Sequence, residues 1–305
     1  MKNKHPRGAA LSPQSSIKPP KVLEVTEEAE LLTFLLAKLT NRNRHNVKTV
    51  LKDKLVWVNG KPVTQFNHIL KVNDKVEVRT GKAPEEQKYR GLSIVFEDEY
   101  IIVIDKAEGV LSIATEKDKD HNAYRILSSH VKKANEHNRI FVVHRLDKDT
   151  SGLMMFAKSE KVKNLLQETW GPTTKERTYL AVVERYPKED KGTISSYLAE
   201  TKALMVYSTQ NPNAGQHAIT HYETINSNED FSLLKVNLET GRKNQIRVHM
   251  QDLGTPIIGD EKYGAKQNPI GRLGLHAWVL AFTHPVTKQK MYFDTKIPKK
   301  FLSLF

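Results

Sequence analysis

The stretch IFVVHRLDKDTSGLMMFA, residues 140–157, carries the strongest signal for fold and function in this chain. Its two apolar runs, residues 140–143 and 153–157, are separated by turn-forming residues at positions 150–152. This pattern predicts two strands joined by a chain reversal. Asp147 lies in that connection beside basic residues, so the sequence presents one carboxylate on a rigid segment between strands.

Three ordinary interpretations of this stretch compete with a functional one. A calcium-binding loop requires a glutamate at its twelfth position, where this chain has Lys158. The run His-Arg-Leu-Asp resembles the His-Arg-Asp-Leu of the protein-kinase catalytic loop, but this chain has neither a glycine-rich phosphate loop nor a following Asp-Phe-Gly. A plain turn, in which Asp147 and Asp149 bind backbone amides, is the usual structure around an isolated aspartate. The rest of the sequence decides between that turn and a catalytic site.

Residues 144–153 resemble the central motif of the RluA family of RNA pseudouridine synthases, which contains the catalytic aspartate of that family. Two further segments resemble motifs of the family and occur in the same order: KERTYLAVV at residues 175–183 and LETGRKNQIRVH at residues 238–249. The resemblance covers most of residues 92–293. It implies an isomerase that converts uridine in RNA to pseudouridine with neither a cofactor nor a metal ion.

The resemblance also implies roles for four residues. Asp147 is expected to be the catalytic carboxylate, acting either by covalent addition or by removal of a ribose proton. Arg247 is expected to pair with Asp147, because a nearby guanidinium favours the charged form of a carboxylate. Arg145 is expected to enter the RNA stack, and Tyr179 to pack on the flipped uracil. The ordinary alternatives are a phosphate contact for Arg247, a surface cation for Arg145 and a core position for Tyr179.

Other conspicuous residues receive structural interpretations. Lys106 and Gly109 resemble the first family motif, in which Ala107 here replaces a proline. His144 is expected to orient its loop and not to transfer protons. The spacing of the later histidines fits no zinc site, and the chain contains no cysteine to accompany them. The histidines expected to be structural are His249, His276 and His284.

The composition bounds the class of protein. With 305 residues, 38% of them hydrophobic, the chain can form one large domain and a small one. It has no run approaching the ~20 apolar residues of a membrane span, so a cytoplasmic protein without a membrane partner is expected. The absence of cysteine excludes disulfides and leaves the redox compartment open.

The charge favours a polyanionic partner. Lys and Arg outnumber Asp and Glu by 48 to 35, which gives a formal net charge of +13. Each phosphate that such a protein neutralises releases counterions and thereby adds to affinity. Because many basic proteins do not bind nucleic acid, the charge alone does not identify the partner. Together with the family resemblance it favours RNA, with no DNA expected and a monomer favoured.

Four regions are expected along the chain. Residues 1–21 contain almost no bulky apolar side chains, which predicts a disordered basic tail. Residues 22–80 are predicted to form two helices and a short sheet with an Asn-Gly hairpin turn, a pattern that resembles the S4 RNA-binding module. A polar linker over residues 81–90 is expected to precede a catalytic domain over residues 91–305.

The S4-like module is expected to bind RNA through basic residues along and between its helices. A solvated helix face is the ordinary alternative, because Lys and Arg are common there. The chain departs from the S4 pattern at Lys54, where a glycine usually follows the second helix. This departure predicts a reshaped turn between helix and strand, and the added cation is not expected to harm RNA binding. The expected RNA-binding residues are Arg42, Arg44, Lys48 and Lys52.

The catalytic domain is predicted to be of the α+β class, with a mixed, largely antiparallel sheet and flanking helices. Strands outnumber helices and several follow one another directly, which argues against a doubly wound fold. The predicted strands are residues 92–96, 100–104, 140–143, 153–157, 178–183, 218–225 and 231–238. The predicted helices are residues 121–135, residues 159–169 with Ser159 as N-cap, and residues 245–253 ended by Gly254.

The leading hypothesis is an RNA pseudouridine synthase that acts on structured RNA. Ribosomal RNA of the large subunit, or a ribosome assembly intermediate, is the expected partner because family members with an S4 module act mainly there. The alternatives are a synthase acting on tRNA and a catalytically silent RNA-binding protein on the same scaffold. A nucleoside hydrolase would need two carboxylates flanking the bond, and only Asp149 is a nearby second acid.

Overall fold

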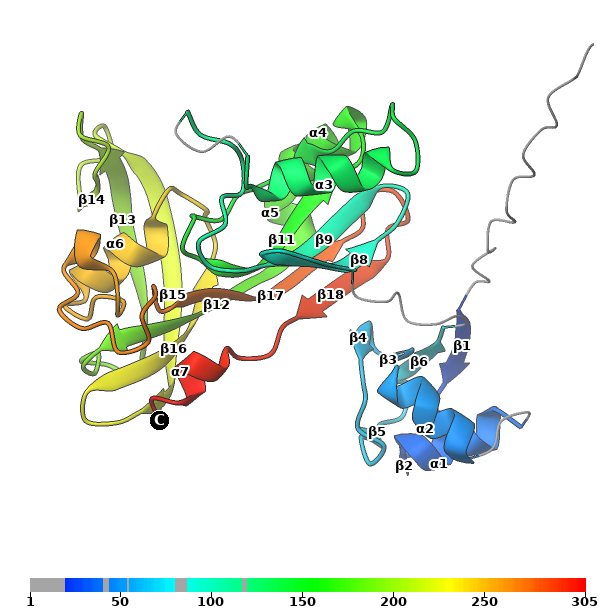
Figure 1. Cartoon of the computed structure of the whole chain (residues 1–305). Helices are drawn as coiled ribbons and strands as arrows, with labels where there is room; N and C mark the ends of the chain where they lie inside the picture. Colours follow the sequence, from blue (N-terminus) through cyan, green and yellow to red (C-terminus); the bar gives the residue numbers. More distant parts are fainter. Residues whose placement is uncertain (1–19, 41–43, 54, 80–86, 117–119) are drawn as a thin grey trace, which may run out of the picture. The chain divides into compact units, whose positions relative to one another are not determined.

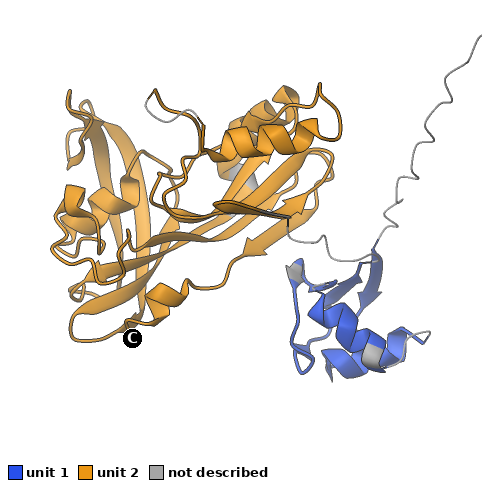
Figure 2. Ribbon diagram, viewed as in Figure 1, with its two compact units in different colours: residues 1–85 blue, residues 86–305 orange. Residues whose placement is uncertain are grey.

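The computed structural model describes residues 20–40, 44–53, 55–79, 87–116 and 120–305 (Figure 1). The chain divides into two compact units, unit 1 over residues 1–85 and unit 2 over residues 86–305 (Figure 2). Most of the expected tail and residues 81–86 of the expected linker lie outside the described residues.

The expected linker is too long at its C-terminal end. Strand β7 (Gln87–Tyr89) pairs antiparallel with β8 (Leu92–Glu97) and therefore belongs to the sheet of unit 2. The segment was predicted as a linker because its sequence is polar. An edge strand has one side free of sheet partners and tolerates polar side chains, so a polar sequence does not exclude a strand there. Unit 2 consequently begins before residue 91.

Unit 1 combines two helices with small antiparallel sheets. The helices are α1 (Leu31–Lys38) and α2 (Arg44–Lys52). Leu31, Leu32 and Leu35 of α1 are buried in the core of unit 1 and Leu36 is partly buried, as their helical spacing predicts. The larger sheet has the order β1 (Lys21–Glu24), β6 (Lys75–Val78), β3 (Val56–Val58) and β4 (Lys61–Pro62), and β2 (Ala29–Glu30) pairs with β5 (Ile69–Leu70).

The predicted Asn-Gly turn joins β3 to β4. Val58 pairs with Lys61, and the two residues between them have positive φ angles of 50° for Asn59 and 79° for Gly60. Two successive left-handed residues are what a two-residue hairpin of this kind requires, and Asn and Gly adopt that conformation at the lowest cost. The hairpin prediction is confirmed.

Unit 2 is built on one twelve-stranded sheet. Among its described strands only β11 and β17 pair in parallel, so the predicted mixed, largely antiparallel α+β fold is confirmed. The main order is β14 (Val206–Thr209), β13 (Lys191–Glu200), β15 (Gln216–Ser227), β16 (Phe231–Leu238), β12 (Thr174–Glu184), β17 (Leu275–Thr283), β11 (Ser151–Ala157), β9 (Ile101–Lys106), β8 and β7. In addition, β10 (Phe141–Val142) pairs with β11, and β18 (Lys290–Asp294) pairs with β17.

Helices cover the two halves of this sheet differently (Figure 1). Alternate side chains of β9 and β11 pack against α3 (Ala123–Lys132) on one face and α4 (Glu160–Glu168) on the other. Burial on both faces explains the continuous apolar sequence of these strands. In the other half, α6 (Gln245–Asp252) packs against β12, β15 and β16. The short helices are α5 (Trp170–Thr173), η1 (Glu261–Tyr263) and α7 (Lys299–Leu302).

The predicted elements of unit 2 all occur, with bounds shifted by a few residues. Ser159 is the N-cap of α4, where its hydroxyl accepts a hydrogen bond from the Val162 amide. The predictions miss β13, β14, β17 and β18. Most residues of β13 are partly or fully exposed, so this strand lacks the apolar run of a buried strand. In the described part of the chain, no helix has the length and apolarity needed to cross a lipid bilayer.

The chain reversal that carries Asp147 differs from its prediction. The turn lies at residues 147–150, where the Thr150 amide donates to the Asp147 carbonyl at 3.2 Å. Residues 151 and 152 already belong to β11. Gly152 has a φ of 109°, and a Cβ there would lie 2.1 Å from the Ala277 carbonyl oxygen. The glycine is therefore required by the close approach of β17 and not by a turn.

Candidate active site

The backbone around Asp147 is pinned on both sides. Before it, the Ser112 hydroxyl donates to the Leu146 carbonyl at 2.6 Å and accepts from the Leu146 amide at 3.1 Å. After it, Lys106 Nζ donates to the Lys148 carbonyl at 3.0 Å. The carboxylate itself lines a cavity and is partly exposed. Asp147 is therefore held in place before a substrate arrives, which is the condition for positional catalysis.

Lys106 connects two loops through a buried ammonium group. Its side chain is fully buried, and Nζ also donates to the carbonyls of Ala107 at 3.0 Å and Val110 at 2.7 Å. Burial lowers the pKa of Lys106 to about 8, although the charges of Asp149 and Asp147 act in the opposite direction. All three protons of the ammonium therefore serve carbonyl oxygens, one of them beside the candidate catalytic aspartate.

Arg247, on α6, is held by three neighbouring side chains. Its Nε and Nη2 each lie 2.7 Å from a different oxygen of Asp260, which forms a two-bond pair with a carboxylate that is only 1% exposed. Its guanidinium lies 4.8 Å from the centre of the Tyr263 ring, and Nη1 donates to Asn244 Oδ1 at 3.3 Å. Burial alone would lower the pKa of Arg247, but the hydrogen bonds and charge of Asp260 outweigh it and raise the pKa.

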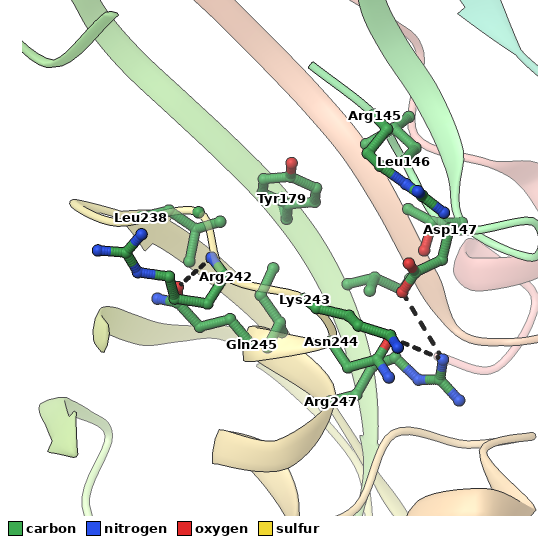
Figure 3. Close-up of a pocket in the computed structure, with 14 residues that line it drawn as sticks. Arg145, Leu146, Asp147, Tyr179, Leu238, Arg242, Lys243, Asn244, Gln245 and Arg247 are labelled. Carbon is green, nitrogen blue, oxygen red and sulfur yellow. Dashed lines mark hydrogen bonds and ion pairs between the residues drawn. The ribbon is translucent and has the colours of Figure 1, made fainter. Parts of the chain in front are cut away.

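The nitrogen that Asp260 leaves free faces Asp147. Arg247 Nη1 lies 3.6 Å from Asp147 Oδ2, so the two residues form an ion pair (Figure 3). Both side chains are partly buried, with 16% of Arg247 and 31% of Asp147 exposed. Because water screens such a pair less than one at the surface, the guanidinium contributes to the electrostatics of the carboxylate.

The two residues line an open cavity of about 340 Å³ (Figure 3). Tyr179, from β12, forms part of its wall, and burial raises the pKa of this phenol, so it stays neutral at neutral pH. Arg145 reaches the cavity from the Asp147 loop with an exposed side chain. The other lining residues are Leu146, Thr150, Leu238, Gly241, Arg242, Lys243, Asn244, Gln245, Ile246 and Leu275.

The turn that leads into α6 is built by Asn244 and Gln245. Asn244 has a φ of 54°, a left-handed conformation that asparagine tolerates, and its Nδ2 donates to the Tyr263 hydroxyl at 2.9 Å. Gln245 Oε1 accepts from the Thr240 hydroxyl at 2.8 Å and from the Arg242 amide at 2.9 Å. These bonds set the start of α6 and hence the direction of Arg247, two residues later.

The histidines expected to be structural have protein partners. Both ring nitrogens of His249 and of His276 lie within hydrogen-bond distance of hydroxyl groups, and Nδ1 of His284 accepts from backbone amides. Burial lowers the pKa values of His249 and His276 to about 4. His144 Nε2 accepts from the Met155 amide at 3.1 Å, and burial lowers its pKa to about 3. His144 therefore orients the Asp147 loop from outside the cavity wall.

The structure brings the four predicted site residues to one cavity: Asp147, Arg247, Tyr179 and Arg145. The predictions missed residues that hold them, namely Ser112, Asn244, Gln245 and Asp260. Asn244 and Gln245 lie within the recognised arginine motif, but nothing in the sequence connects Asp260, 13 residues after Arg247, to the site. Of the expected RNA-binding residues in unit 1, Arg44, Lys48 and Lys52 are exposed on α2, whereas Arg42 lies outside the described residues, as does Lys54.

Comparison with known families identifies the class of this protein. A family model described as RNA pseudouridylate synthase matches residues 100–252, about half of the chain. The matched region contains the Asp147 loop, β12 with Tyr179, and α6 with Arg247. The chain belongs to this family: it is an RNA pseudouridine synthase, an isomerase that acts on RNA.

Individual relatives agree with this assignment, and a solved structure shares the fold. An uncharacterized RNA pseudouridine synthase of Mycoplasma pneumoniae is 35% identical, over 91% of this chain and 92% of the relative. One of Bacillus subtilis is 34% identical, over 79% of this chain and 86% of the relative. The solved human RNA pseudouridylate synthase domain containing 4 has the same fold over 70% of this chain and 90% of its own, with a TM-score of 0.57 and 24% identity.

Proposed function

We propose that Asp147 is the catalytic carboxylate of this synthase and that Arg247 is its ionic partner. The observation that carries this proposal is the 3.6 Å pair between them, made by a guanidinium whose other side is fixed by Asp260. A carboxylate with one defined cationic partner, at the edge of a cavity, is the arrangement expected of a functional acid. Asp149, which is exposed and does not line the cavity, has no comparable place in the reaction.

The remaining cavity residues fit the isomerisation of uridine. The reaction breaks the bond from ribose C1′ to N1 of the base and remakes it to C5, so no group is transferred and no redox change occurs. Asp147 acts in this reaction either by covalent addition or by proton removal. Tyr179 packs on the flipped uracil, and Arg145 enters the RNA stack to hold the duplex open. Such a rearrangement within one molecule depends on positioning, which the pinned Asp147 loop supplies.

We further propose that the RNA is structured ribosomal RNA of the large subunit or an assembly intermediate that contains it. Unit 1 supports this proposal because its two helices are followed by strands of a short sheet, which β1 joins from before the helices, and this arrangement resembles the S4 RNA-binding module. Its helix α2 exposes Arg44, Lys48 and Lys52 to solvent, where they can neutralise phosphates. A synthase acting on tRNA would use the same catalytic residues and is distinguished only by its target.

Two experiments test these proposals. Pseudouridines are mapped in ribosomal RNA and tRNA from cells with the intact protein, without it, and with the Asp147→Asn variant. A site that disappears in both altered strains identifies the target and requires the carboxylate for its formation. If the variant restored the site, Asp147 would not be the catalytic group. If the lost site lay in tRNA, the assignment of ribosomal RNA as the target would be wrong, but the assignment of Asp147 as the catalytic carboxylate would still hold.

A further inference from the structure

One aromatic side chain of unit 1 is exposed, whereas the other aromatic side chains described in this unit are buried. The described part of this unit, up to residue 79, contains three aromatic residues of the Phe, Tyr and Trp types. Phe34 and Trp57 are 6% and 7% exposed, and Trp57 is further covered by the Arg79 guanidinium, 3.7 Å from its ring centre. Phe66 is 53% exposed. The ring forgoes the stabilisation that burial gives, and its surface is open to contact by a ligand.

The turn that carries Phe66 is held in place by backbone hydrogen bonds. The Phe66 carbonyl accepts from the Leu32 amide at 3.0 Å, and the His68 carbonyl accepts from the Leu31 amide at 2.8 Å. These two amides open α1, whose N-cap Glu30 makes no side-chain capping bond. The turn therefore accepts hydrogen bonds from backbone amides that have no partner within the helix, and the same bonds hold the turn against the helix. The exposed ring is presented by a fixed segment of the fold.

A stripe of cations runs beside this ring. Arg44, Lys48 and Lys52 are each four positions apart on α2 and all three are exposed, so they lie along one face of the helix. The helix sequence RHNVKTVLK contains no acidic residue to neutralise them. Lys48 Nζ lies over the Phe66 ring, 5.6 Å from its centre, so one cation of this stripe contacts the aromatic ring directly.

We propose that Phe66 is a stacking platform for an unpaired RNA base, with the flanking phosphates bound by the cations of α2. The inference rests on the proposed RNA-binding role of unit 1 and adds the kind of RNA that it recognises. An aromatic face accepts any base without reading its edge, and an adjacent cation stripe follows the backbone of the same strand. Bases in a duplex are stacked on each other and do not offer their faces, so unit 1 selects unpaired RNA over duplex RNA.

The test compares two probes on the full-length protein. One is a labelled single-stranded oligouridylate of twelve nucleotides, and the other is a labelled RNA duplex of twelve base pairs. Binding is measured by fluorescence anisotropy at several salt concentrations. Phe66→Ala is expected to weaken binding of the single strand by roughly five- to a hundredfold, the range found when a stacking aromatic is removed, and to leave duplex binding within about twofold.

Further variants separate stacking from charge and from apolar contact. Phe66→Tyr is expected to keep the affinity for the single strand, whereas Phe66→Leu is expected to lose it, because leucine retains apolar surface without a π face. Phe66→Ala should leave the slope of log affinity against log salt unchanged, while Lys48→Ala should make it shallower by about 0.7. Val72→Ala, at an exposed apolar residue of unit 1 with 54% exposure, is the control and should change neither quantity.

Each other outcome contradicts the inference in its own way. Equal losses on both probes, or a Phe66→Leu variant as good as Phe66→Tyr, would show that the ring serves apolar docking and not base stacking. Unchanged binding by Phe66→Ala together with weaker binding by Lys48→Ala would overturn the stacking platform but keep RNA binding by unit 1. If neither variant changed binding, the RNA-binding role of unit 1 would fail, while pseudouridine formation, measured separately, would still test Asp147.

Discussion

Arg247 and Arg145 both line the cavity around Asp147, but they differ in how far their side chains are held by the rest of the protein. Arg247 is 16% exposed, makes two hydrogen bonds to Asp260 and one to Asn244, and stacks near Tyr263. Arg145 is exposed and has no hydrogen bond or ion pair to any side chain or backbone group in the described ranges. One side of the cavity is preorganised and the other is left free.

This difference indicates that the two arginines lose different amounts of conformational entropy when the substrate binds. A guanidinium that is already fixed loses no further side-chain entropy when the substrate binds, so it suits a group that must face the proposed catalytic carboxylate. A free arginine retains on the order of 2 kcal/mol of rotamer entropy, which binding must offset. That cost is acceptable where the side chain has to follow a substrate that changes shape, such as RNA from which a base is flipped.

The strongest test of the preorganised side is the carboxylate itself. Asp147→Asn is expected to lower the rate of pseudouridine formation by about 10³-fold or more, the scale found when an essential catalytic group is removed. RNA affinity should stay nearly unchanged, because the amide has the same shape. Single-turnover rates at saturating enzyme measure the first quantity and titrations measure the second. The matched control is Asp149→Asn, and equal losses in the two variants would instead favour a mechanism with paired carboxylates.

Asp260→Asn tests whether Arg247 must be held. The variant removes the charge of the carboxylate that makes two hydrogen bonds to this partly buried guanidinium and leaves it only the longer pair with Asp147, so we expect a loss of about 3 kcal/mol in the free energy of unfolding. A displaced Arg247 should also lower the rate by roughly a hundredfold, the cost of misplacing a catalytic group by about 1 Å. Thermal unfolding and single-turnover kinetics measure the two effects. Glu261→Gln, at the exposed acid next in the chain, is the control. Loss of stability with full activity would show that the hydrogen bonds between Asp260 and Arg247 serve only the fold.

Arg145→Ala tests the free side. The variant should keep its stability, because the side chain has no partners in the described structure to lose. It should lower the rate roughly tenfold through weaker base flipping, a step that costs a few kcal/mol. A fluorescent base analogue at the target position reports flipping directly, and Arg139→Ala removes an exposed cation outside the cavity as a control. Normal flipping with a slower chemical step would move Arg145 into the catalytic centre.

The smallest expected effect concerns pH and Lys106. With a pKa of about 8, its ammonium loses a proton as the pH rises through 8, and the remaining amine has two donors for three carbonyl oxygens. The Asp147 loop should then loosen, and the single-turnover rate should fall a few-fold between about pH 7 and pH 9. Lys106→Met, compared at equal fraction folded, should lack this decline. The same decline in the variant would assign it to another group.

The sequence predicted which residues meet at the cavity better than it predicted the structure that holds them. Asp147, Arg145, Tyr179 and Arg247 lie in recognisable motifs, and the cavity brings all four together. The Asn-Gly hairpin and the N-cap of α4 were also predictable, because each depends on local backbone chemistry. The strand β7 was predicted as linker, because an edge strand need not be apolar.

The hydrogen bonds from Arg247 to Asp260 could not be predicted, because Asp260 lies in a segment without a recognisable motif. Asp260 becomes a partner only when the chain after α6 folds back onto the helix. The role of Gly152 was misjudged for a similar reason: its lack of a side chain serves the approach of β17, more than a hundred residues away. In both cases the deciding neighbour lies in a different segment, 13 residues away for Arg247 and more than a hundred for Gly152.

The sequence by itself determined the class of this protein, its fold class and the identities of the residues at its cavity. These depend on periodicity, local turn chemistry and motifs, all of which are contained within short segments. Only the tertiary structure decided that Arg247 is fixed while Arg145 is free, and that Lys106 supports the Asp147 loop. Burial, ion pairing and pKa depend on which groups the fold brings together from distant segments, and short-range sequence patterns do not encode that arrangement.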